Sequence, residues 1–146
     1  MFKHILLPTD GSELATAALK RGIALAKEMG AKVTLVGVIE PLHVLTANPS
    51  ALSESLAKLE ASTERQLRVS LEAGEADAKA AGVTVQALVG RDEDVAGEIV
   101  RTAEREGCDL IALATHGRRG LWKLATLGSQ TQRVVQNATM SVLVLR

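Results

Sequence analysis

The sequence contains almost no aromatic residues. Phe2 and Trp122 are the only two among 146 residues, and tyrosine is absent. Hydrophobic residues still make up 47% of the chain, so its core must be built from Ala, Val, Leu and Ile. Many proteins that bind single-stranded nucleic acids stack the bases on several aromatic side chains. The shortage of aromatic residues excludes this class.

The chain also lacks an excess of charge and has little cysteine. Lys and Arg total 17, as do Asp and Glu, so the formal net charge is zero and an anion site must be local. The single cysteine, Cys108, cannot form an internal disulfide, which is typical of a reducing compartment. Because Cys108 precedes Asp109 and an apolar run, we predict a buried, unreactive thiol.

No signal segment opens the chain, and no apolar run is long enough to span a bilayer. A length of 146 residues suits one compact domain. No linker, repeat or low-complexity tract divides it. We therefore expect one domain over residues 1–146, located in the cytoplasm.

Short apolar runs alternate with longer segments of helical periodicity. We predict strands at residues 4–7, 31–40, 83–90, 108–115 and 140–146. We predict helices at residues 12–30, 50–81, 92–107 and 129–138, with Gly74 as a weak point in the second. Strands that alternate with helices and are apolar on both faces are typical of a parallel sheet covered on both sides. The sequence predicts a doubly wound, Rossmann-like α/β fold with a five-stranded parallel sheet and helices on both faces.

The last predicted strand, residues 140–146, has no helix after it and is expected to be an edge of the sheet. Its apolar run Val142–Leu145 favours pairing with a second copy of the chain. The alternative is an edge shielded by the chain's own loops. We favour a homodimer.

Ligands of open α/β sheets bind beyond the carboxyl ends of the strands, at the point where the strand order reverses. Two segments of this sequence are expected to follow directly on the ends of strands. The first is PTDGS, residues 8–12, and the second is THGRRG, residues 115–120. They meet if the first strand is central and the fourth lies beside it. Gly117 and Gly120 lack a Cβ atom, which allows backbone amides to approach an anion.

Other residues supply the remaining parts of a nucleotide pocket. Gly128 and Ser129 open the last helix, whose N-terminal amides favour anions. Asp10 can bond a ribose hydroxyl or, through water, a metal on the phosphates, and Val38 offers an apolar backbone edge to a base. The cationic contacts would come from Arg118, Arg119 and Lys123.

Each of these features also has a structural explanation. The glycines can simply allow a tight turn, and the basic residues can belong to a solvated loop. Ser129 can be the N-cap of the last helix. Asp10 can cap the first helix in a capping box with Glu13, in competition with Ser12. His116 has no partner nucleophile, which favours a loop histidine. Residues 41–49 are either a lid over the crevice or a surface connection.

Both ends of the chain resemble the universal stress protein family. FKHILLPTDGSELATAAL resembles the opening strand, turn and first helix of that family, and THGRRGLWKLATLGSQTQRVVQNATMSVLVLR resembles its phosphate loop, last helix and dimer strand. The resemblance implies an adenine nucleotide alpha hydrolase-like fold, a homodimer through residues 140–146, and ATP or AMP as ligand, with or without Mg. The nucleotide-binding positions that it implies are Pro8, Thr9, Asp10, Val38, Ala114, His116, Gly117, Arg118, Gly128, Ser129 and Gln130.

The loop departs from the pattern Gly-x-x-Gly-x9-Gly-Ser/Thr of the nucleotide-binding members. Ala114 stands at the first glycine, and residues 118–127 make the loop one residue longer. The main hypothesis is an adenine-nucleotide-binding stress-response protein, at most a weak ATPase, with no catalytic residues assigned. The alternative is a dimeric interaction module that binds no nucleotide. A third hypothesis, an adenylating enzyme, would need a substrate domain that this sequence does not show.

Overall fold

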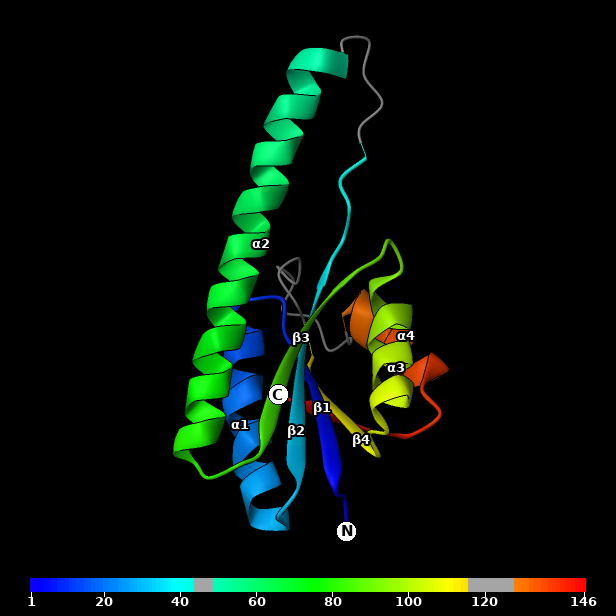
Figure 1. The fold of residues 1–146 in the computed structure, drawn as a ribbon. Helices are drawn as coiled ribbons and strands as arrows, with labels where there is room; N and C mark the ends of the chain where they lie inside the picture. The colour runs from blue at the N-terminus through cyan, green and yellow to red at the C-terminus, as the bar shows by residue number, and fades with distance from the viewer. Residues whose placement is uncertain (44–48, 116–127) are drawn as a thin grey trace.

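The computed structural model describes residues 1–43, 49–115 and 128–146, and its strands and helices alternate along the chain (Figure 1). The strands are β1 (His4–Pro8), β2 (Lys32–Ile39), β3 (Val85–Arg91), β4 (Leu110–Ala114) and β5 (Ser141–Leu145). The helices are α1 (Glu13–Met29), α2 (Pro49–Ala80), α3 (Val95–Glu106) and α4 (Ser129–Asn137). The predicted alternation is confirmed. Pro8, expected to stop the first strand, is instead its last residue.

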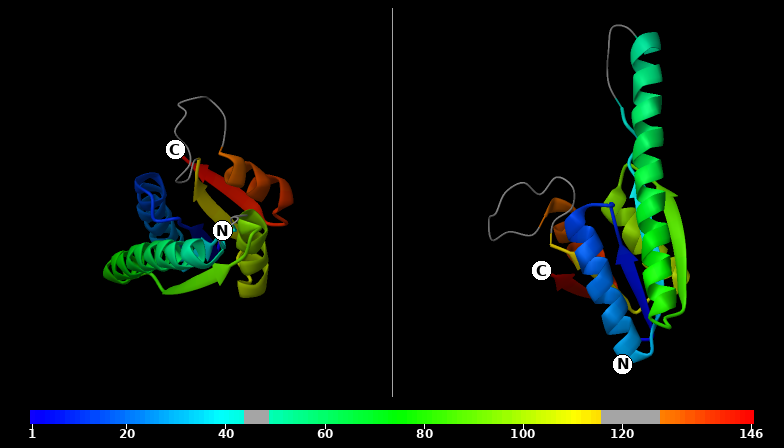
Figure 2. Two further views of the ribbon diagram at one scale, coloured as in Figure 1. Left: turned by 90° about the horizontal axis from the view of Figure 1, so that it is seen from above. Right: turned by 90° about the vertical axis from the view of Figure 1, so that its left-hand side faces the viewer.

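All five strands form one parallel sheet in the order β3-β2-β1-β4-β5. The first strand is therefore central, with β4 beside it, as the site hypothesis required. Helices α1 and α2 cover one face, and α3 and α4 cover the other (Figure 2). The doubly wound α/β fold is confirmed. The sheet has a second edge at β3, where every residue is partly buried or exposed.

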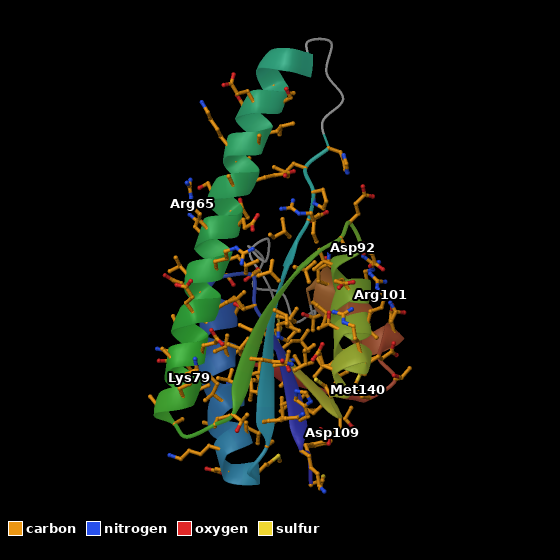
Figure 3. The ribbon with its side chains drawn as sticks, viewed as in Figure 1. Arg65, Lys79, Asp92, Arg101, Asp109 and Met140 are labelled. Carbon is orange, nitrogen blue, oxygen red and sulfur yellow. The ribbon has the colours of Figure 1, made fainter. Side chains whose placement is uncertain are left out.

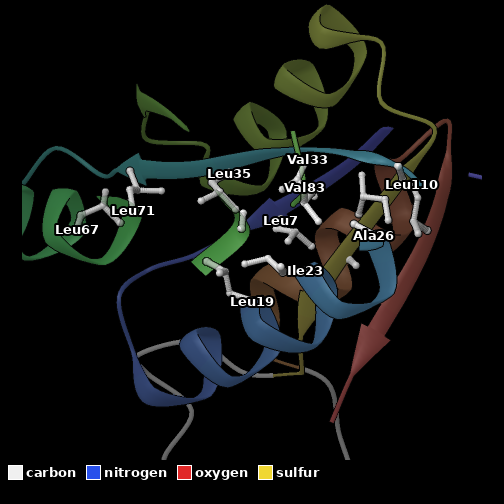
Figure 4. Close-up of a cluster of buried hydrophobic side chains, with 14 of the residues drawn as sticks. Leu7, Leu19, Ile23, Ala26, Val33, Leu35, Leu67, Leu71, Val83 and Leu110 are labelled. Carbon is white, nitrogen blue, oxygen red and sulfur yellow. The ribbon is translucent and has the colours of Figure 1, made fainter. Parts of the chain in front are cut away.

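The core consists of two aliphatic clusters, one on each face of the sheet. Leu7, Leu19 and Leu35 belong to the cluster beneath α1 and α2, where leucines of all these elements interdigitate (Figure 4). Ile111 and Val134 belong to the cluster beneath α3 and α4. The composition therefore predicted the chemistry of the core correctly.

Ser12 is the N-cap of helix α1, which settles the competition between two possible caps. The Ser12 hydroxyl accepts a hydrogen bond from the Ala15 amide at 3.2 Å, as an N-cap does. Asp10 instead accepts from the Ser12 amide at 2.9 Å. The helix ends at Gly30, whose φ of 64° is the left-handed conformation that favours glycine.

Helix α2 has 32 residues, and its first half extends beyond the carboxyl ends of the strands (Figures 1 and 2). Gly74 lies where the second half packs on the body. A Cβ atom there would lie 2.9 Å from Leu35 Cδ1 and 3.1 Å from Leu19 Cδ2. Gly74 thus allows close packing of α2 against β2 and α1. Neither α2 nor any other described helix is long and apolar enough to cross a membrane.

His4, on β1, is buried away from the carboxyl edge of the sheet. Its Nε2 atom lies 2.8 Å from the Thr34 hydroxyl, and its buried Nδ1 atom has no hydrogen-bond partner among the described residues. Burial, together with repulsion from Lys32, lowers the pKa of His4, although the carboxylates of Asp109 and Glu106 oppose the shift. The folded protein therefore holds this imidazole in its neutral form more firmly than the unfolded chain does.

This lowered pKa predicts that acid weakens the fold. Below pH 6.5 the unfolded chain binds a proton at His4 before the folded protein does, so the free energy of unfolding falls as the pH falls through this window. One such group contributes a slope of at most about 1.4 kcal/mol per pH unit. We expect urea unfolding at pH 7.5 and 5.5 to show this loss, and His4→Leu to reduce it. His43→Leu, at an exposed histidine, is the control. A His4→Leu variant with the full wild-type loss would contradict the prediction.

Candidate functional site

A pocket of about 440 Å³ opens at the carboxyl edge of the sheet, between the two helix layers. Its lining comes from the ends of β1, β2 and β4 and from all four helices. The volume lies in the range of small-molecule sites, and the position is the one where open α/β sheets bind ligands.

The turn after β1 forms the floor of this pocket. The Thr9 amide donates to the Val36 carbonyl at 2.9 Å and so continues the pairing of β1 with β2. The Thr9 hydroxyl accepts from the Gly11 amide at 3.1 Å, and Asp10 bonds the next amide. Gly11 has a φ of 79°, which favours glycine. The turn is thus held by its own side chains, with Asp10 lining the pocket.

The N-terminus of α4 reaches the pocket because two hydrogen bonds attach it to the end of β4. The Thr131 hydroxyl donates to the Ala114 carbonyl at 2.9 Å, and the Gly128 amide donates to the Thr115 carbonyl at 2.7 Å. Gly128 is the N-cap, and as a glycine it makes no side-chain cap hydrogen bond. Ser129 is therefore the first helical residue. The alternative that the sequence offered for Ser129, a role as N-cap, is wrong.

The outer face of α4 is attached to α3 by an ion pair. Arg133 donates to Asp94 Oδ1 at 2.6 Å, while Asp94 caps α3 by accepting from the Gly97 amide at 3.1 Å. The Gly97 amide, with Arg133 and Arg101, lowers the pKa of Asp94. Arg101 also bonds Asp92 at 2.9 Å, close to the start of α3 (Figure 3). These contacts orient α4 relative to the sheet.

Helix α2 contributes a wall of the pocket that the sequence did not reveal. Leu59, Glu60, Thr63 and Leu67 line the pocket. The sequence showed leucines of α2 at spacings of three and four, but this pattern indicates only that one face of the helix is covered. It does not show that the upper part of that face borders a cavity.

Most of the predicted site residues meet in this one pocket. The predicted residues in its lining are Pro8, Thr9, Asp10, Val38, Ala114, Gly128, Ser129 and Gln130. Ala114 therefore lies in the wall of an open pocket and does not fill it. His116, Gly117 and Arg118 lie outside the described residues.

The described pocket lining offers hydroxyl, carboxylate and backbone groups. Within residues 1–43, 49–115 and 128–146, no group of three or more His, Cys, Asp or Glu is arranged to hold a metal ion. Cys108 is buried and is not in the pocket lining, and burial raises the pKa of its thiol to about 11. The prediction of a buried cysteine is confirmed.

Comparison with known sequences identifies relatives over the whole length of the chain. A sequence model of the universal stress protein family matches residues 1–146. A universal stress protein of Methanocaldococcus jannaschii is 36% identical over 149 residues, which cover 100% of this chain and 83% of the relative. A second one from the same organism is 30% identical over 161 residues, with 100% and 96% covered.

Solved structures agree with this comparison. The structure of the second Methanocaldococcus jannaschii protein matches with a TM-score of 0.79 at 30% identity, covering 99% of this chain and 96% of that one. The universal stress protein UspA of Lactobacillus plantarum matches with a TM-score of 0.84 at 24% identity, covering 99% and 97%. Because UspA is only 24% identical to this chain, its similarity shows the fold alone.

Three further structures with the same fold contain nucleotides. A protein of the family from Arabidopsis thaliana has AMP bound (TM-score 0.66, 16% identity, 98% and 90% covered). One from Archaeoglobus fulgidus is in complex with dAMP (TM-score 0.65, 15% identity, 100% and 98% covered). A third universal stress protein is in complex with cAMP (TM-score 0.67, 20% identity, 99% and 97% covered).

The attachment of α4 to β4 can be tested through Thr131, whose side chain is buried. Thr131→Val keeps the shape of the side chain but leaves the Ala114 carbonyl without this donor. We expect the free energy of unfolding to fall by about 1–2 kcal/mol and amide exchange at the start of α4 to accelerate. Ser129→Ala is the control, since Ser129 is exposed at the first position of α4. Equal stability of both variants in urea denaturation would contradict the prediction.

Proposed function

This chain belongs to the universal stress protein family, and we propose that its pocket binds an adenine nucleotide, ATP or AMP. The observation that carries the proposal is that one pocket contains both the Asp10 turn and the start of α4, whose N-cap is a glycine. Related proteins of the same fold bind AMP, dAMP and cAMP, which supports an adenine nucleotide as the ligand class.

In this proposal the phosphates lie at the start of α4. The helix dipole and the first backbone amides, those of Ser129 and Gln130, favour an anion there. The Ser129 hydroxyl adds a donor, and Gly128 lets the ligand approach the backbone. The sequence predicts further contacts from His116, Gly117 and Arg118.

The ribose and the base lie on the other side of the β1 turn. The Asp10 carboxylate accepts hydrogen bonds from ribose hydroxyls, and it contributes through water when Mg²⁺ accompanies ATP. Val38 and Leu42 line this end of the pocket and cover the base with apolar surface.

We propose a regulatory binding protein in which nucleotide occupancy is the signal. The described pocket lining contains Thr and Ser hydroxyls and carboxylates but no histidine, cysteine or lysine. These groups can hold a nucleotide through hydrogen bonds, which is the role that the proposal assigns to them.

We further propose that two copies pair through β5. This strand is an edge of the sheet, and Val142, Leu143, Val144 and Leu145 are only partly buried in the single chain. Pairing of β5 with the β5 strand of a second copy would provide hydrogen-bond partners for the backbone groups on the outer side of the strand. It would also cover these side chains.

The phosphate position is tested by Ser129→Asp. A carboxylate at the first helical position interacts favourably with the dipole by about 0.3–1 kcal/mol, so the free protein should keep its melting temperature. The same charge repels phosphate, so we expect the Kd for ATP to rise at least about tenfold. Isothermal titration calorimetry measures this change.

Adenosine, which has no phosphate, should bind Ser129→Asp and wild type alike, and Ser129→Ala gives the effect of losing the hydroxyl alone. Equal ATP affinity in wild type and Ser129→Asp would place the phosphates elsewhere. If ATP and AMP at millimolar concentration do not raise the melting temperature of the wild type, the nucleotide proposal fails. The interaction module without nucleotide then takes its place.

The β5 pairing is tested by Val144→Pro. The Leu145 carbonyl accepts from the Thr115 amide at 3.2 Å, so the polar backbone groups of Leu145 point to β4 and those of Val144 point to the free edge. Proline at position 144 removes an outward amide and spares the β4 pairing. We expect a monomer with an unchanged circular dichroism spectrum, as measured by light scattering after size exclusion.

Val144→Thr keeps the amide and the branched side chain, and it should remain dimeric. A Val144→Pro variant that stays dimeric at the same concentration would exclude β5 as the interface. A monomeric wild type would exclude the homodimer itself.

A further inference from the structure

We infer that Glu60, on α2, selects the base of the nucleotide by accepting a hydrogen bond from the exocyclic amine of adenine. The inference rests on the proposed function, because it concerns the base end of the same pocket. It assigns a role to the wall of the pocket that the sequence did not predict.

The sheet order separates the two ends of the pocket. Strand β4, with the start of α4, lies on one side of β1, and β2 lies on the other, beneath α2. Two strand spacings amount to about 10 Å, which is comparable to the reach of a mononucleotide from its phosphate to its base. A phosphate at Ser129 therefore directs the base towards the wall that carries Glu60.

This wall is apolar except for a few polar groups. Val38, Leu42, Leu59 and Leu67 line it and can cover the faces of a planar ring. Once the faces are covered, the polar edge of the base must find a partner within the pocket, because an unpaired buried polar group is costly. Glu60 is the charged side chain that α2 contributes to the described pocket lining.

The Glu60 carboxylate is held in one orientation. Its Oε1 atom accepts from the Leu42 amide at 2.7 Å, and its Oε2 atom lies 3.4 Å from Nη1 of Arg91, at the end of β3. The other terminal nitrogen of Arg91 bonds Glu64 at 3.1 Å. These contacts attach α2 to the strand ends and fix the carboxylate before a ligand arrives.

An ionised carboxylate only accepts hydrogen bonds, and its two oxygens offer about four acceptor positions, so Glu60 keeps capacity for a ligand. Adenine presents an amine donor at the position where hypoxanthine presents a carbonyl oxygen. A carbonyl facing Glu60 would leave two acceptors opposed and unpaired, and sites of this kind reject the analogue strongly. Geometry and chemistry therefore favour AMP over IMP.

The same carboxylate also sets the direction of the nucleotide. Glu40 and Glu60 both line this end of the pocket, and their charges disfavour a phosphate there. The start of α4 favours a phosphate at the opposite end. The two ends of the pocket thus act together to place the base on α2.

The test compares AMP with IMP, which differ at the 6-position of the base and in the hydrogen that IMP carries on N1. We expect the wild type to bind AMP roughly tenfold or more tightly than IMP in calorimetric titrations. Glu60→Gln replaces a pure acceptor with a group that both donates and accepts, so the ratio of the two Kd values should fall to within about twofold.

Glu64→Gln is the matched control, because Glu64 lies one turn further along α2 and also bonds Arg91 but does not line the pocket. This variant should keep the wild-type ratio. If it shifts the ratio as far as Glu60→Gln does, Glu60 acts by positioning α2 and the inference is wrong. If the wild type binds AMP and IMP equally, or Glu60→Gln keeps the wild-type ratio, the inference falls while the proposed function stands. If the wild type binds neither nucleotide, both fall.

Discussion

The parallel pairing of β1 with both of its neighbours is the constraint on which the rest of this molecule depends. Because all strands run in the same direction, their carboxyl ends meet at one edge of the sheet. Because β1 is central, the chain turns to one side for β2 and to the other for β4. The Asp10 turn consequently lies between two walls that are far apart in sequence, and the pocket exists between them.

Hydrogen bonds to the backbone hold two walls of the pocket in place, which gives the site a defined shape without a ligand. Gly128 and Thr131 attach α4 to the end of β4, and Glu60 attaches α2 to the segment after β2. The side chains at the centre, Thr9 and Asp10, bond their own turn. A pocket built in this way loses little conformational freedom when it binds, which favours affinity.

The two proposed interactions of this protein use separate parts of the sheet. The proposed nucleotide pocket lies at the carboxyl ends of the central strands, whereas the proposed dimer contact follows the edge strand β5. Helix α4 and β4 connect them, since α4 begins at the pocket and β4 pairs along its length with β5. A nucleotide at the start of α4 therefore lies close to the element through which two copies would meet.

The sequence by itself determined the alternation of strands and helices, the aliphatic core, the glycine that ends α1, and the family. It also indicated the Asp10 turn and Ser129 as parts of one candidate site, because turn residues after a strand and at a helix start are local signals. The strand order that brings them together came from the tertiary structure. Only the tertiary structure decided between Ser12 and Asp10 as the cap, since both side chains can accept the same kind of hydrogen bond. It alone showed that Gly74 serves close packing and that Glu60 faces a cavity. Helical periodicity reveals which residues share a face, but what that face meets depends on contacts between segments distant in the chain.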